Sequence, residues 1–331
     1  MAKFGRLRII IQLIVGVAII LWLLQLADSR NVFATIFQVK PLNLIVAAIF
    51  FIIASTFVAL GLYAPLRQFN PTVPVRKVIM ASFAGQLLSD VTPVRSGYFL
   101  TPIFLNELAN IPVEQGMTGV LATGGVNSIM KVLICLIGLG YFASFLPLDA
   151  GFINALIVGV SVLLIAGAFL LLLMWEKRLS RLIARFEGLP LIGKTLHKFA
   201  EMLNNVQEQG RKVKRSLISV AVLILLSVLG NATALYFIFD GLWHNSLLSL
   251  IDFFFLASVA SALTYVPITI AGLGVQEAGY VILLSLLLKL PLVPPDPSLV
   301  AFALITRALF TGTDIIGVGP LIRVGLKHKS S

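Results

Sequence analysis

Long apolar runs dominate the chain, and six of them are long enough to cross a lipid bilayer as single helices. A helix needs about 20 consecutive apolar residues to span the hydrocarbon core. Runs of this length lie at residues 9–26, 42–62, 117–142, 152–175, 217–239 and 298–320. The pattern therefore predicts an all-α, polytopic integral membrane protein with six full transmembrane helices.

Two further apolar stretches carry breaks at their centres. Residues 78–105 are interrupted by SDVTPVRSG at 89–97, and residues 250–288 are interrupted by PITIAGLGVQE at 267–277. Proline removes a backbone hydrogen-bond donor and glycine weakens a helix, so each stretch is expected to form two half-helices. The residues expected to break these helices are Pro93, Gly97, Pro267, Gly272 and Gly274.

The distribution of basic residues decides how the broken stretches cross the membrane. If the N-terminus is cytoplasmic and both stretches are re-entrant hairpins, nineteen of the 25 Lys and Arg residues fall in inside segments, and only Arg30, Lys40 and Lys289 fall outside. A single crossing by either stretch moves a strongly basic segment outside, against the positive-inside rule. A topology in which both arms of each hairpin cross the membrane fully places every loop on the same side, so it remains an alternative to the re-entrant hairpins. Both termini are expected in the cytoplasm, in a multi-pass protein of the plasma membrane.

This topology predicts an inverted repeat within a single transmembrane domain covering residues 1–331. Residues 1–145 contain two helices, a hairpin from the inside and a helix, and residues 146–331 contain the same order with a hairpin from the outside. The second repeat includes a basic segment, residues 176–215, whose apolar positions recur at helical spacing, which predicts a cytoplasmic amphipathic segment. Inverted repeats with broken helices are typical of transporters, whose substrate site lies between the repeats.

Composition agrees with the membrane assignment and excludes several other classes. The hydrophobic fraction is 59%, charged residues make up 12%, and the net charge is +11. The basic residues flank apolar runs, so they orient the protein and contact anionic lipid, and we expect no nucleic-acid partner. One cysteine, Cys135, and three scattered histidines give no metal-ligand spacing. No metal, cofactor or catalytic constellation is predicted, and the oligomeric state is left open.

Six ionisable residues fall at membrane depth. A charged side chain at the centre of a transmembrane helix costs at least about 2.5–3.5 kcal/mol, so each requires a partner or a polar cavity. Asp90 and Arg95 lie at the first break, Glu277 follows the second, Lys131 lies in the helix after the first hairpin, and Arg307 and Asp314 lie in the last long helix. One interpretation is structural ion pairing of three cations with three anions. The other is a cavity that binds a charged lipid headgroup, because guanidinium groups bind phosphate bidentately.

The segment from Val266 to Glu277 (VPITIAGLGVQE), with Arg307 thirty residues further on, resembles the lysylphosphatidylglycerol synthase transmembrane-region family, also called flippase-like proteins. Members of that family show a proline, a Gly-Gly-Leu-Gly turn and a glutamate, followed by an arginine in the next helix. This chain has Ala271 where the family usually has the first glycine of that turn. The element Pro93-Val94-Arg95-Ser96-Gly97 resembles the family's first-half motif. The resemblance implies movement of an amphiphilic lipid, such as an aminoacyl-phospholipid or a polyprenyl-linked glycan, between leaflets.

Three functions compete at this point. A flippase-like transporter would bind lipid phosphate with Arg95 and Arg307, while Glu277 pairs with an arginine in the empty state or with a headgroup amine. The partners would then be membrane lipids, anionic or lipid-linked. A membrane-embedded enzyme or enzyme partner would use Asp90 and Glu277 as paired carboxylates on a lipid-linked substrate. An ion or small-solute transporter could use the same inverted plan.

Overall fold

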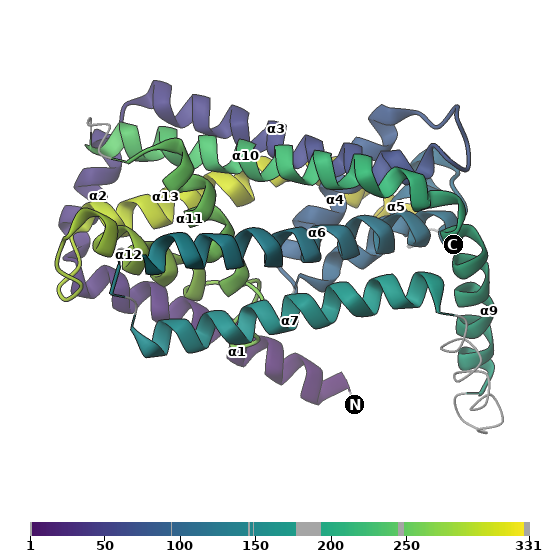
Figure 1. Ribbon diagram of the computed structural model, residues 1–331, viewed down its shortest axis with the longest axis horizontal. Helices are drawn as coiled ribbons and strands as arrows, with labels where there is room; N and C mark the ends of the chain where they lie inside the picture. The colour runs from purple at the N-terminus through teal and green to yellow at the C-terminus, as the bar shows by residue number, and fades with distance from the viewer. Residues whose placement is uncertain are drawn as a thin grey trace.

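The computed structural model describes residues 2–93, 95–144, 146–147, 149–176, 193–243 and 248–327, and every regular element in these ranges is a helix (Figure 1). The all-α class predicted from the hydrophobic pattern is confirmed. Five helices are long and apolar enough to span a membrane: Pro41–Leu66, Val113–Ala143, Ala150–Trp175, Lys212–Trp243 and Pro297–Val324. These five coincide with five of the six predicted runs.

The long helices pack side by side along the long axis of the molecule (Figure 1). They are α3 (Pro41–Leu66), α6 (Val113–Ala143), α7 (Ala150–Trp175), α10 (Ser216–Trp243) and α13 (Pro297–Asp314). A Cβ placed on Gly230 of α10 would lie 3.2 Å from the Cβ of Ala54 on α3. Small residues at such contacts let helices approach closely within a membrane.

The first predicted run ends at a sharp bend. α1 (Ala2–Leu26) is followed by α2 (Ser29–Gln38), and the two helices meet at 89°. If this pair counts as one span, the described chain has up to six spans. The sequence prediction placed Arg30 outside, between two spans, without a helix of its own. In the structure a helix begins at Ser29, where the Asp28 carboxylate accepts a hydrogen bond from the Arg30 backbone N–H at 3.2 Å.

Both predicted helix breaks are present. In the first, α4 (Val75–Asp90) is followed by η1 (Ser96–Leu100) and α5 (Thr101–Ala109), and in the second, α11 (Leu250–Leu263) is followed by α12 (Val275–Leu288). α4 and α5 lie toward one end of the long helices, whereas α11 and α12 lie toward the other (Figure 1). The two breaks nevertheless meet, because Pro93 and Ile270 form an isolated antiparallel bridge.

A further helix stands at the end of the bundle where the C-terminus also lies (Figure 1). α9 (Gly193–Gly210) buries Leu203 and Val206 and exposes Glu208 on its opposite face, and it is joined to α10 by η2 (Lys212–Arg215). The Gln207 amide donates hydrogen bonds to the backbone oxygens of Leu173 and Glu176. This part of the predicted segment 176–215 is an amphipathic helix, and residues 177–192 lie outside the described residues.

Apolar side chains fill the interior of the molecule and also cover its outer faces. Phe239, Phe253 and Phe302 are fully buried and contact one another through their rings or through Trp243. Large apolar side chains such as Ile49 on α3, Ile137 on α6 and Ile165 on α7 are exposed. Lipid tails satisfy such surfaces, as expected for membrane-spanning helices. The chain continues beyond α13 through η3 (Ile315–Gly317) and α14 (Val318–Lys327).

Candidate functional site

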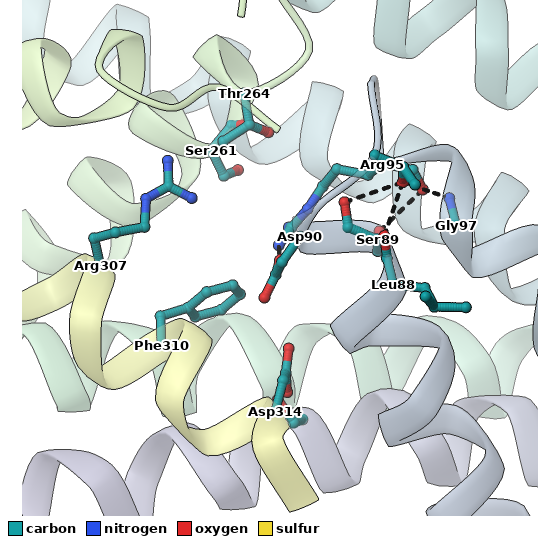
Figure 2. Close-up of polar contacts among 12 residues, drawn as sticks. Leu88, Ser89, Asp90, Arg95, Gly97, Ser261, Thr264, Arg307, Phe310 and Asp314 are labelled. Carbon is teal, nitrogen blue, oxygen red and sulfur yellow. Dashed lines mark hydrogen bonds and ion pairs between the residues drawn. The ribbon is translucent and has the colours of Figure 1, made fainter. Parts of the chain in front are cut away.

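The first break is held together by hydroxyl groups and a close backbone approach. Ser89 donates a hydrogen bond to the Arg95 backbone oxygen at 2.9 Å, and the Gly97 N–H donates to Thr92 Oγ1 at 2.7 Å (Figure 2). A Cβ on Gly97 would lie 2.4 Å from the backbone of Leu88, so only glycine fits there. The turn carries Arg95 in the left-handed region, with φ of 57°.

This turn directs the Arg95 side chain into the molecule. Its guanidinium forms an ion pair with Asp90, five residues earlier, and lies over the Phe310 ring at 5.2 Å from the centroid. The Asp90 side chain is 1% exposed and that of Arg95 is 18% exposed. The aromatic face adds a cation–π contact to the ion pair, which helps to keep a charged group at this depth.

The second break depends on left-handed backbone rather than on hydroxyl groups. Ala271, Gly272 and Gly274 have φ values of 46°, 73° and 81°. A Cβ on Gly272 would lie 2.4 Å from Thr264 Cα, so the turn folds directly back onto the end of α11. α1 covers this turn, where the Gln12 amide donates a hydrogen bond to the Pro267 oxygen at 3.1 Å.

Glu277 joins the second break to the last long helix. One carboxylate oxygen accepts a hydrogen bond from the Gly274 N–H at 2.6 Å and so caps α12, and the other accepts from Arg307 Nε on α13. A carboxylate at a helix N-terminus also interacts favourably with the helix dipole. The side chain of Glu277 is 2% exposed and that of Arg307 is 15% exposed. The predicted pairing of Glu277 with an arginine is therefore present, and that arginine is Arg307.

Two adjoining cavities contain the candidate site. The smaller, of about 80 Å³, is lined by the Arg307–Glu277 pair together with Ser261, Thr264 and Gln276. The larger, of about 280 Å³, is lined by Asp314 and by hydroxyl and amide side chains such as Ser128, Asn127 and Ser227. Arg95, Lys131, Asn231 and Phe310 line both cavities. These four residues therefore belong to the boundary that the two cavities share.

Arg307 has unused hydrogen-bonding capacity beside the smaller cavity. Its Nη2 has no hydrogen-bond partner among the described residues, although the guanidinium is bound to Glu277 through Nε. Figure 2 shows the guanidinium directed toward Ser261, on α11, and toward Thr264, the residue that follows this helix. Nη2 is itself buried, so an anion would reach this donor only after the side chains around it move.

Of the three basic residues at the site, Lys131 is the one that forms no ion pair with a carboxylate of the described residues. Its ammonium lies over the Tyr265 ring, at 5.6 Å from the centroid. The ion pairs that the described residues form at the site are Arg95–Asp90 and Arg307–Glu277. Lys131 thus places an amine in the wall that the two cavities share.

The six predicted charged residues therefore gather around one region. The structural interpretation of complete internal pairing holds for two pairs, but Lys131 and Asp314 do not pair with each other. Asp90 and Glu277 each bind an arginine rather than each other. No group of three or more His, Cys, Asp or Glu residues that could hold a metal ion occurs in the described ranges.

The sequence prediction missed several polar residues of the site. Asn231 lines both cavities from α10, and the Tyr265 ring makes a cation–π contact with Lys131. Ser55 on α3 donates a hydrogen bond to Asp314 at 3.3 Å. Asn231 and Gln12 are polar residues inside long apolar runs, which was the available signal. Ser55 gave no signal, because a serine can satisfy its hydroxyl within its own helix.

Comparisons with known proteins agree with this arrangement. A comparison with curated proteins finds no match to the chain. A family model described as the lysylphosphatidylglycerol synthase TM region matches residues 9–313, which span both breaks and five of the six charged residues and end one residue before Asp314. The chain belongs to the lysylphosphatidylglycerol synthase transmembrane-region family.

Proposed function

We propose that this protein is a flippase-like transporter that moves an amphiphilic, phosphate-bearing lipid between the leaflets of the plasma membrane. The observation that carries the proposal is the Arg307 guanidinium, which has a free Nη2 beside a cavity that Arg95 and Lys131 also line. Membership of a lipid-related membrane family supports a lipid as the substrate. Aminoacyl-phospholipids and polyprenyl-linked glycans both have the required phosphate.

Lipid phosphate would bind by exchange with a carboxylate. In the empty state Glu277 neutralises Arg307, so neither charge is left unpaired in a low-dielectric environment. A phosphate entering the smaller cavity would bind Nη2 first and then share the guanidinium with Glu277, while Arg95 and Lys131 stabilise its remaining charge. The acyl chains would remain in the surrounding lipid.

The meeting of the two breaks supports a pathway through the middle of the molecule. Backbone that departs from a helix at membrane depth has to be buried in protein or line a wet cavity, because lipid cannot satisfy its hydrogen bonds. The Pro93–Ile270 bridge joins the two breaks. We propose that the breaks belong to two re-entrant hairpins of an inverted repeat, residues 1–145 and 146–331, whose relative movement opens the site to each leaflet.

A reconstitution experiment tests the function. The purified protein in vesicles is given headgroup-labelled lipids with a neutral, an anionic or an aminoacyl headgroup, and an external impermeant quencher reports their exposure. We expect rapid loss of the protected inner-leaflet signal for at least one phosphate-bearing lipid. Vesicles that conduct ions but leave every labelled lipid in place would contradict the proposal and favour an ion transporter.

Cysteine labelling tests the proposed orientation, with both termini cytoplasmic. In a background that replaces the buried Cys135 with alanine, an impermeant reagent should label Ala150→Cys, at the exposed start of α7, from outside intact cells. Thr72→Cys, in the exposed turn before α4, should label only after the cells are opened. The reverse result would contradict the proposed topology.

A further inference from the structure

Two carboxyl groups that the proposed exchange does not use face each other beside the larger cavity. Asp314 is on the last turn of α13 and Asp90 is on the last turn of α4, and their carboxyl groups point toward one another (Figure 2). Asp314 is 1% exposed, and so is the side chain of Asp90. The two groups belong to helices far apart in the sequence, so the fold brings them face to face.

The hydrogen bonds around this pair leave one oxygen without a donor. Asp90 Oδ1 accepts from Arg95, and Asp314 Oδ1 accepts from Ser55 Oγ at 3.3 Å. Asp90 Oδ2 is buried and has no hydrogen-bond partner among the described residues. The group that faces it is another carboxyl, which can donate a hydrogen bond only if it carries a proton.

The charges near the pair do not neutralise two carboxylates. The titratable side chains that line the larger cavity with Asp314 are Arg95, Lys131, Tyr98 and Tyr265. Arg95 is bound to Asp90 and Lys131 lies over Tyr265. The polar side chains that α3 and α10 contribute to this cavity are neutral: Ser55, Ser227 and Asn231. On α13 itself, Arg307 is bound to Glu277. Two carboxyl groups that face each other in a low-dielectric site favour binding of a proton between them.

We propose that Asp90 and Asp314 share one bound proton and that this site couples lipid transport to a proton gradient. The coupling rests on the proposed lipid-transport function. When lipid phosphate draws the Arg95 guanidinium away from Asp90, the released carboxylate binds a second proton from the aqueous side that the cavity then faces. When the phosphate leaves, Arg95 returns to Asp90 and that proton is released to the other side. One O–H bond forms and breaks in each cycle, and no other covalent bond changes.

Infrared spectroscopy tests the shared proton without any transport. The full-length protein in lipid vesicles is expected to show the carbonyl stretch of a protonated carboxyl group at neutral pH. Asp314→Asn and Asp90→Asn should each remove this band. Asp149→Asn, which changes an exposed N-cap carboxylate of α7, is the matched control and should leave the band unchanged. A wild-type spectrum without the band, or a band that survives both substitutions at the pair, would overturn the proposal.

Transport under an imposed pH gradient tests the coupling. For one proton per lipid, each unit of pH difference should change the equilibrium ratio of labelled lipid between leaflets about tenfold. Asp314→Asn removes the carboxyl group that shares the proton with Asp90, so the lipid movement that remains in this variant should no longer depend on the gradient. Lipid that distributes equally with and without the gradient overturns the coupling while the proposed function stands. If no lipid moves in any vesicle, the proposed function and the coupling both fail, and the infrared band alone decides whether the pair holds a proton.

Discussion

Each of the two helix breaks carries a buried ion pair, but the two pairs are held by different contacts. At the first break the ion pair is local, because Asp90 and Arg95 are five residues apart, and hydroxyl groups of Ser89 and Thr92 hold the turn. At the second break the ion pair joins two helices, because Glu277 caps α12 and binds Arg307 on α13. The first pair can thus open without separating helices, whereas the second is part of the packing.

The two arginines also differ in the number of carboxyl groups around them. Asp314 lines the larger cavity together with Arg95, so a second carboxylate is available if Asp90 is lost. Glu277 is the only carboxylate among the described residues that line the smaller cavity with Arg307. We therefore expect Glu277 to be the more costly residue to change, and the predictions below test that order.

The largest effect is expected for Glu277→Gln. The substitution leaves Arg307 as a buried positive charge without a carboxylate, which typically costs about 3–5 kcal/mol. Thermal unfolding of the purified protein measures the change. Glu208→Gln, on the exposed face of α9, is the matched control and should stay within about 0.5 kcal/mol of wild type.

The double variant Glu277→Ala with Arg307→Ala separates pairing from substrate binding. Removing both charges should recover much of the stability that Glu277→Ala alone loses, because no unpaired charge remains. Lipid transport should stay lost. A double variant that transports normally would mean that this pair is only structural and that the headgroup binds elsewhere.

A smaller effect is expected for Asp90→Asn. The amide oxygen can still accept a hydrogen bond from Arg95, and Asp314 can take over its charge, so the loss should be about 1–2 kcal/mol. Parallel unfolding of Asp90→Asn and Glu277→Gln measures the order directly. Equal or reversed losses would refute the contrast between a local and a helix-joining pair.

The smallest effect, and the only gain, is expected for Ala271→Gly. Ala271 has φ of 46°, a left-handed conformation that costs a residue with a Cβ about 1–2 kcal/mol. Glycine at this position should therefore stabilise the protein by about 1 kcal/mol. Ala260→Gly inside α11 is the control and should destabilise, because glycine weakens a helix interior. A loss of stability in Ala271→Gly would show that the Ala271 methyl group packs usefully.

The hydrophobic pattern was sufficient to predict much of this fold. Proline and glycine located both breaks, because their backbone constraints are local. α2 was missed because a short helix after a bend carries no span-length signal. The six charged residues were found because charge at membrane depth is rare. Their partners were harder to predict: nothing in the sequence assigned Lys131 to Tyr265 or Asp314 to Ser55, since these contacts depend on how helices rotate against one another.

Transport by Arg307→Lys is the most direct test of a phosphate site at this arginine. Lysine keeps the positive charge opposite Glu277 but loses the planar group that binds a carboxylate and a phosphate at once. Arg323→Lys, at an exposed position on α14, is the matched control. In reconstituted vesicles we expect Arg307→Lys to remain folded and to lose at least about tenfold in the rate of lipid movement, a change of about 1.4 kcal/mol in the barrier, while Arg323→Lys keeps the wild-type rate. Wild-type rates in both variants would contradict a lipid-phosphate site at Arg307.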